Sequence, residues 1–285
     1  MSSEEGSSSS SSSSMWSKLM PDPPLLVAGG VGGPCVMLLV TPLRNALTIA
    51  ATNNKASAGE IYGKVFKHGI RGGWTGGMYP MIPAVPQFCV IGPMFHVFKD
   101  IFGGSTSAGL LATATTETLI SFGAETRNAQ MASGVTKGLH NPLKPFGPGV
   151  AVHIARNAVA MSGFRLMSQP IRNAFGVKDS GGFATVTSDL VANLIASAVS
   201  MPLHQLYGYT VVTSAKQSPG TPAPSLNEKV VDAKAFLRRQ FLVPGTNRLS
   251  SLALRDVVLR CNYNATIYTL YGFIERGCVS YFEDS

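Results

Sequence analysis

Charge is scarce in this sequence. Only 13% of its 285 residues are Asp, Glu, Lys or Arg, whereas a soluble domain carries about 25%. The mean hydropathy is +0.18, and apolar stretches recur from Leu25 to the C-terminus. So few charged groups cannot cover the surface of a globule this large, which argues against a water-soluble enzyme. The recurrence of the stretches argues against a single span. The composition predicts an all-α membrane protein that crosses the bilayer several times.

Paired cysteines and a targeting segment are also missing. The four cysteines lie far apart, without a C-x-x-C pair or a His at ligand spacing: Cys35, Cys89, Cys261 and Cys278. This spacing argues against a structural zinc site and against a disulfide framework. Residues 1–14 are nearly pure serine after Glu4 and Glu5. They show neither a secretory signal nor an Arg-rich presequence, and we expect a Ser-rich tail over residues 1–20.

Six windows are long enough and poor enough in charge to cross a bilayer, which takes about 17–25 residues. They are Leu25–Leu43, Met78–Phe98, Ile101–Ala124, Val150–Ala174, Gly181–Val212 and Leu252–Ile274. The fourth and sixth windows contain several charged residues. We therefore expect these two to face a bundle interior or a water-filled cavity rather than lipid all round.

The charges between these windows alternate in sign. The three connections that follow an odd-numbered window carry net charges of +3, +2 and +4. The N-terminal tail, the other two connections and the C-terminus carry −2, 0, +1 and −2. Because basic loops stay on the inner side of a membrane, both termini are predicted outside and the basic loops inside. This distribution accounts for the net charge of +8 and leaves no face for nucleic acid.

Turn-like breaks recur at a fixed spacing near the ends of the odd windows. They fall at Pro42, Gly123 and Pro202, which are 81 and 79 residues apart. Such a period indicates three copies of one unit. The predicted repeats are 21–102, 103–178 and 179–285, each with two apolar helices joined by a basic loop. Short helices are predicted within the loops at Ser57–His68 and Asn227–Gln240, whereas the middle loop, Ser133–Phe146, is too short and Pro-rich for a full one.

This organisation resembles the mitochondrial carrier family over essentially the whole chain after Pro21. Residues 69–80 read Gly-Ile-Arg-Gly-Gly-Trp-Thr-Gly-Gly-Met-Tyr-Pro, similar to the family's Gly-x-x-Gly-aromatic-basic-Gly turn before an even-numbered helix. Arg260, with Tyr271 eleven residues later, resembles the family's sixth helix, and Arg156 holds the similar position in the fourth. The resemblance implies six transmembrane helices in three pseudo-repeats in the mitochondrial inner membrane, with both termini in the intermembrane space.

The charges that close a carrier are mostly absent. In the family, an acid and a base at the kinked ends of the odd helices pair between adjacent repeats and close the matrix side. The corresponding positions form a degenerate matrix gate: Arg44 and Leu47, Glu125 and Asn128, and His204 and Tyr207. Only the pair of Arg44 with Glu125 is left to form. On the opposite side, the fourth helix reads Phe164-Arg165 or Met167-Ser168, neither with the expected acid, and the sixth ends in Glu275, the wrong sign. A transporter alternates between two closed states, so we predict impaired transport.

Several residues have two interpretations each. Arg156 and Arg260 are candidates for contact with an anionic solute in a central cavity, or for pairing within the bundle, where Asp256 lies one turn before Arg260. His204 fits either a protonatable gate or a hydrogen-bonded interior position. The resemblance suggests that a structural phospholipid, such as cardiolipin, binds at a four-residue site, although a turn that merely packs fits equally: Gly72, Gly73, Trp74 and Gly76. No nucleotide-loop spacing, catalytic constellation or metal-ligand set is visible, so no enzyme activity, metal or other cofactor is predicted.

Two functions follow from these observations. The first is an accessory, structural subunit of a large inner-membrane complex, because carrier-like proteins serve as subunits of respiratory complexes in some protists. Cytochrome oxidase, or a supercomplex that contains it, is the predicted host. The alternative is an active carrier that exchanges a small anionic solute bound by Arg156 and Arg260. A subunit would migrate with a large complex after mild detergent extraction, and a carrier near its own mass.

Overall fold

The computed structural model describes residues 22–50, 53, 56–74, 81, 83–177, 182–217 and 224–283. Within these ranges the chain is all-helical, and its only extended pairing is an isolated bridge between Leu242 and Leu249. The predicted all-α class is therefore confirmed. The Ser-rich tail and Gly76 lie outside the described residues.

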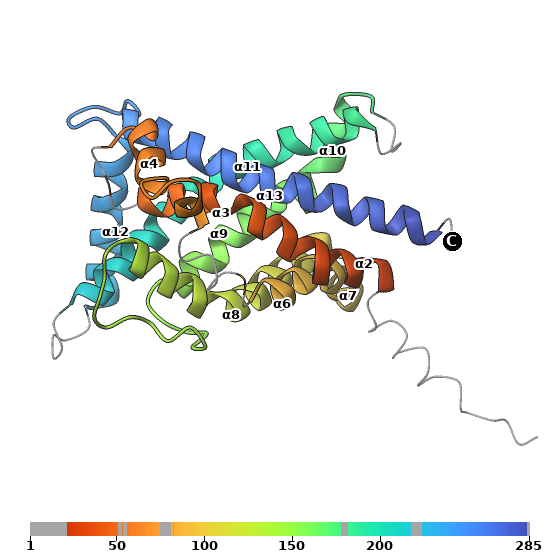
Figure 1. The fold of residues 1–285 in the computed structure, drawn as a ribbon, viewed down its shortest axis with the longest axis horizontal. Coiled ribbons are helices and arrows are strands. Elements are labelled where there is room, and N and C mark those ends of the chain that lie inside the picture. Colours follow the sequence, from red (N-terminus) through yellow and green to blue (C-terminus); the bar gives the residue numbers. More distant parts are fainter. Residues whose placement is uncertain are drawn as a thin grey trace, which may run out of the picture.

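Six long helical runs lie along one axis of the molecule (Figure 1). In chain order they are α2 (Pro23–Val27) with η1 (Ala28–Gly32) and α3 (Gly33–Ala50); α6 (Ala84–Cys89) with η3 (Val90–Met94) and α7 (Phe95–Ile101); α8 (Thr106–Ala132); α9 (Val150–Ser162) with η4 (Gly163–Met167) and α10 (Ser168–Ala174); α11 (Phe183–Lys216); and α13 (Ser251–Glu283). Each run packs on the next, and α13 packs back on α3, so the runs close into a ring.

Each run lies at one of the six predicted windows, and the fourth has the predicted bounds, Val150–Ala174. By length and apolarity alone, two of the described helices qualify as membrane spans: Pro23–Ala50 and Phe183–Lys216. The others fall short of that test because polar side chains interrupt them, and many of these are buried within the ring.

Two short helices lie across one end of the ring (Figure 1). These are α4 (Ala58–Val65) and α12 (Leu226–Phe241), close to the predicted loop helices. Each begins with a capping box, and donation from the backbone and hydroxyl of Ser57 lowers the pKa of Glu60. Residues 133–149 contain no helix, as predicted for the middle loop. We call the end of the ring that α4 and α12 cross the loop end. The start of α2 and the C-terminal end of α13 lie at the opposite end, which we call the tail end.

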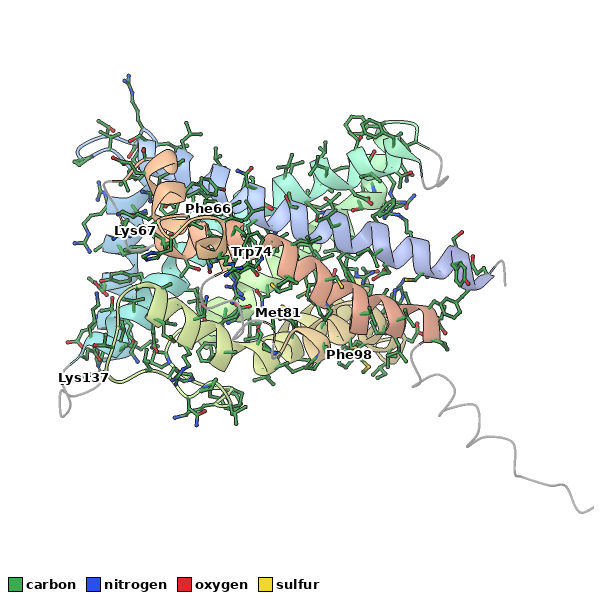
Figure 2. The ribbon with its side chains drawn as sticks, in the orientation of Figure 1. Phe66, Lys67, Trp74, Met81, Phe98 and Lys137 are labelled. Atoms are coloured by element: carbon green, nitrogen blue, oxygen red, sulfur yellow. The ribbon has the colours of Figure 1, made fainter. Side chains whose placement is uncertain are left out.

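The carbonyl that Pro42 leaves without a helical hydrogen bond has a specific donor. Because proline has no N–H, the carbonyl of Leu38 one turn earlier loses its helical donor. The indole Nε1 of Trp74 donates to that carbonyl over 2.8 Å. Trp74 is the last residue of the short 3-10 turn η2 (Ile70–Trp74) and lies beside α3 in Figure 2. The Gly-Gly-Trp motif therefore fixes the first run, close to its proline, against its own loop.

Close glycine contacts bring the runs together. A Cβ at Gly29 would lie 2.9 Å from the carbonyl oxygen of Phe88, and one at Gly33 would lie 2.2 Å from the Phe88 ring. A Cβ at Gly123, the second predicted break, would lie 2.3 Å from the carbonyl oxygen of Pro142. Gly29 and Gly33, spaced as Gly-x-x-x-Gly, thus let the first run pack closely on the second, and at Gly123 the middle loop packs closely on α8.

We expect Gly29→Ala to lower the free energy of unfolding by about 1–3 kcal/mol, the usual cost of overpacking. The added methyl would meet the backbone of Phe88 and Cys89, which cannot move aside as a side chain can. Gly30→Ala is the matched control, because its Cβ would meet only the Cys89 sulfur at 4.0 Å. Alanine favours a helix over glycine, so the control should be neutral or slightly stabilising. Thermal unfolding in detergent measures both, and equal effects would contradict this account of the packing.

Candidate functional site

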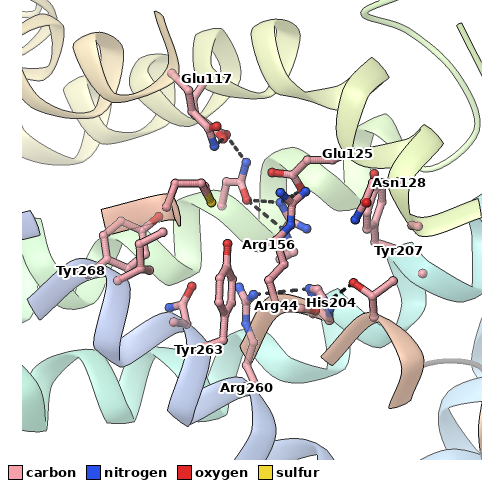
Figure 3. Close-up of a pocket in the computed structure, with 18 of the residues that line it drawn as sticks. Arg44, Glu117, Glu125, Asn128, Arg156, His204, Tyr207, Arg260, Tyr263 and Tyr268 are labelled. Atoms are coloured by element: carbon pink, nitrogen blue, oxygen red, sulfur yellow. Dashed lines mark hydrogen bonds and ion pairs between the residues drawn. The ribbon is translucent and has the colours of Figure 1, made fainter. Parts of the chain in front are cut away.

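The centre of the ring holds a cavity of about 60 Å³ (Figure 3). Its charged lining comes from α3, α8, α9 and α13: Arg44, Glu117, Glu125, Arg156 and Arg260. Both predicted cavity residues, Arg156 and Arg260, are among them. Of the predicted gate positions, all but Leu47 also line it: Arg44, Glu125, Asn128, His204 and Tyr207. The structure therefore brings most of the predicted site residues together.

The ion pair at Glu125 differs from the one expected. Its carboxylate accepts from Arg156 Nη2 over 3.0 Å and lies 3.5 Å from His153 Nε2. Arg156 also donates to the side chain of Asn157 and lies over the ring of Tyr207, 5.0 Å from its centroid. The one inter-repeat pair that the sequence left possible, Arg44 with Glu125, is not among the ion pairs of the described residues, where Arg156 holds the carboxylate instead. Since α8 and α9 belong to the same predicted repeat, this pair does not link two repeats.

Glu117, which sequence reasoning missed, is the second carboxylate of the cavity. It is 2% exposed and accepts hydrogen bonds from Gln87, Ser121 and Asn157. Glu117, Glu125 and His153 lie near enough to share a metal ion. However, Arg156 already contacts Glu125 and His153, and its positive charge opposes a cation there. The cluster is instead a hydrogen-bonded network that joins α8 and α9 to α6.

Two buried arginines of the cavity have no carboxylate partner among the described residues. Arg44 is 6% exposed, and its Nη1 is buried without a hydrogen-bond partner. Arg260 is 2% exposed, and its hydrogen bonds within the described part of the chain go to Ser200 and His204, each at 3.4 Å. Asp256, the alternative partner predicted for Arg260, pairs with Arg255 instead. With both carboxylates ionised, the charged lining still carries three arginines against two acids, so the cavity favours an anion over a cation.

Two further gate positions, Leu47 and Tyr207, are uncharged and form no ion pair. Leu47 is buried in an apolar cluster with Ile61 and Leu259, where the first run meets α4 and α13. The hydroxyl of Tyr207 is 2.8 Å from that of Thr126, which links α11 to α8. Apolar and hydrogen-bonded contacts thus occupy places where carriers have inter-repeat ion pairs.

At the tail end, Arg165 contacts all three predicted repeats. Its guanidinium donates to both oxygens of Glu275 on α13, each over 3.0 Å, and to the carbonyl of Ile91 on η3 over 2.8 Å. It also lies 4.2 Å from the centroid of the Phe164 ring and 4.6 Å from that of Phe95. The side chains of Arg165 and Glu275 are only 8% and 11% exposed.

A second ionic contact at the tail end joins α11 to its two neighbours. Asp189 of α11, which is 1% exposed, lies 2.6 Å from Arg276 Nη1 on α13 and 3.5 Å from Arg172 Nε on α10. Sequence reasoning had not assigned Asp189 or Arg276 a role.

At the loop end, Arg255 fastens α13 to the end of the first run. Its guanidinium donates to the carbonyls of Ala50, Asn53 and Ala56 over 2.7–3.1 Å and pairs with Asp256. Gln240 of α12 donates to the same aspartate over 2.7 Å. Arg255 therefore donates to three carbonyls at and just after the end of the first run. Through Gln240 and Asp256, α12 is held to the same arginine.

The predicted lipid-binding glycines are tightly packed. Gly72 and Gly73 are buried, and the N–H of Gly72 already donates to the carbonyl of Gly69. A Cβ at Gly72 would lie 2.9 Å from the carbonyl of Val65. Gly72 also borders a cavity of about 250 Å³ that includes Lys64 and His68. Both glycines therefore have a packing reason to lack a side chain.

The chain matches no protein-family model and no curated protein sequence. The interpretation of the site therefore depends on the contacts described above. A signal for one missed pair was present in the sequence: Arg165 stands where carriers have an acid, and Glu275 where they have a base. Considered together, the two reversed signs predict a complementary pair.

Proposed function

We propose that the chain is a six-span membrane protein of the mitochondrial carrier type that does not exchange solutes. In this proposal it serves as a structural, accessory subunit of a large complex in the mitochondrial inner membrane. Cytochrome oxidase, or a supercomplex that contains it, is the proposed host. Both termini would face the intermembrane space, and protease added to mitoplasts would then cut the tails and spare the basic loops.

Exposed apolar side chains support the membrane position. Large apolar residues along four runs are 50–88% exposed, an arrangement that suits lipid and not water. They are Val31, Leu38, Leu39, Leu111, Phe183, Val199, Leu254 and Phe273. Polar and charged side chains of the same runs are buried within the ring. This distribution, together with the closed ring of six runs, favours six crossings.

One observation supports the proposed absence of solute exchange. Hydrogen bonds and ion pairs join the predicted repeats at both ends of the ring at the same time. Arg165 joins all three at the tail end. At the loop end, Arg255 joins the third repeat to the first, and Tyr207 with Thr126 joins the third to the second. Alternating access requires one end to open while the other closes. The only acidic gate residue, Glu125, pairs within its own repeat and supplies no charge for that exchange.

The test is reconstitution of the purified protein in liposomes. We expect no uptake of phosphate, malate or ADP above that of protein-free liposomes, because breaking buried ion pairs at either end is strongly unfavourable. A working carrier reconstituted in parallel is the positive control. Saturable uptake that Arg260→Ala abolishes would show that the chain is a carrier.

A second candidate, exchange of a small anion, is favoured by one specific feature. Arg44 and Arg260 line the central cavity without carboxylate partners among the described residues. An anion there would neutralise charges that are otherwise buried uncompensated. The liposome assay distinguishes this function from the structural one, because a trapped anion would not be exchanged.

A further inference from the structure

An apolar groove with a cationic edge lies on α12, away from the central cavity. It has a volume of about 670 Å³ and lies between α12, Pro202 of α11 and the connection to α13. Its apolar lining consists of Pro202, Val230, Ala233, Leu237, Phe241 and Leu242. Two cations, Lys234 and Arg238, also line it. They lie one turn apart on the helix, so they share a face with the apolar residues between and around them.

The cations of α12 have no ion-pair partner among the described residues. The two acids on the helix are engaged elsewhere: Glu228 caps the N-terminus at Ser225, and Asp232 accepts from the hydroxyl of Tyr209 over 3.0 Å. Lys234 and Arg238 at the groove are therefore left with unbalanced positive charge, as are Lys229 and Arg239 outside it.

The orientation of α12 suits a membrane surface. In Figure 1 the helix runs across the loop end, crosswise to the long runs. If the runs cross a bilayer, α12 lies in the plane of its inner interface, where amphipathic helices with basic residues contact lipid. This step rests on the membrane position proposed above, but it does not depend on the assembly role.

We infer that this groove binds an anionic phospholipid. The acyl chains would lie against the apolar lining, and the phosphate would lie between Lys234 and Arg238. A neutral phospholipid would fill the same space without balancing the two charges, and a free anion would leave the apolar lining in contact with water. The site lies in the third predicted repeat, distinct from the Gly72–Trp74 turn of the first.

The experiment compares two variants that remove equal charge from the same helix. Lys234→Gln/Arg238→Gln removes the cations at the groove, and Lys229→Gln/Arg239→Gln removes two that do not line it. The full-length protein is purified in a neutral detergent and titrated with dioleoyl-phosphatidylglycerol, with the shift in thermal unfolding as the readout. Dioleoyl-phosphatidylcholine and inorganic phosphate are titrated in parallel.

We expect the wild type to bind phosphatidylglycerol more tightly than phosphatidylcholine and to show no shift with phosphate. The groove variant should bind phosphatidylglycerol about 30-fold more weakly, since each basic residue near an anionic lipid contributes about 1 kcal/mol. The control variant should lose less than threefold. Equal loss in both variants, equal binding of the two lipids, or a shift with phosphate alone would each overturn the inference. If the site fails while the protein still comigrates with a large complex, only the lipid inference is lost.

Discussion

Glu275→Gln is expected to lower the free energy of unfolding by about 3–5 kcal/mol, the cost of removing one partner from a buried ion pair. The change leaves the guanidinium of Arg165 buried between Phe95 and Phe164 without its carboxylate. The carbonyl of Ile91 and the glutamine oxygen would still accept hydrogen bonds, but neither carries the compensating charge. Thermal or denaturant unfolding of the detergent-solubilised protein measures the loss.

Two further variants separate the ion pair from general damage. Glu283→Gln removes an exposed carboxylate from the last turn of the same helix and should have almost no effect. Arg165→Met/Glu275→Met removes both charges and should recover most of the stability lost in Glu275→Gln, because apolar side chains can replace a buried pair. If the double variant is as unstable as Glu275→Gln, the pair does not act through compensation of charge.

Arg156→Met should destabilise the protein by a similar amount, about 3–5 kcal/mol. The variant leaves Glu125 with His153 as its nearest described ion-pair partner and removes the donor to Asn157. Asn157 in turn donates to Glu117, so the whole network between α8 and α9 loses its central cation. The same unfolding measurement applies.

Its controls follow from the same contacts. Lys137→Met removes an exposed cation from the middle loop and should change stability by less than about 0.5 kcal/mol. Arg156→Met/Glu125→Gln removes both charges of the pair and should be more stable than Arg156→Met alone. A double variant that is less stable than the single one would show that Glu125 has found another cation, for which Arg44, in the lining of the same cavity, is a candidate.

The placement of the helices was largely predictable from the sequence because it depends on local patterns. Val150–Ala174 follows from a run of mostly apolar residues between Gly-rich segments, and the loss of a helical donor to the Leu38 carbonyl follows from the missing N–H of Pro42. The absence of a helix in 133–149 follows from its length and its prolines. Each of these features is decided by residues close together in the chain.

The pairing of buried charges was not predictable in the same way. Whether Arg44 or Arg156 reaches Glu125 depends on how α3, α8 and α9 are rotated about their axes, which no local pattern specifies. The donation from Trp74 to Leu38 spans 36 residues and depends on the path of the intervening loop. Arg165 and Glu275 are 110 residues apart, and only their reversed signs relative to carriers indicated a pair.

The most direct test of the structural role is a native gel of mitochondria extracted in mild detergent and probed for this chain. The account predicts that the protein migrates with a complex many times its own mass of 30.0 kDa, and that digestion of the gel band finds respiratory subunits beside it. Migration near its own mass under conditions that keep the respiratory complexes intact would contradict the proposal.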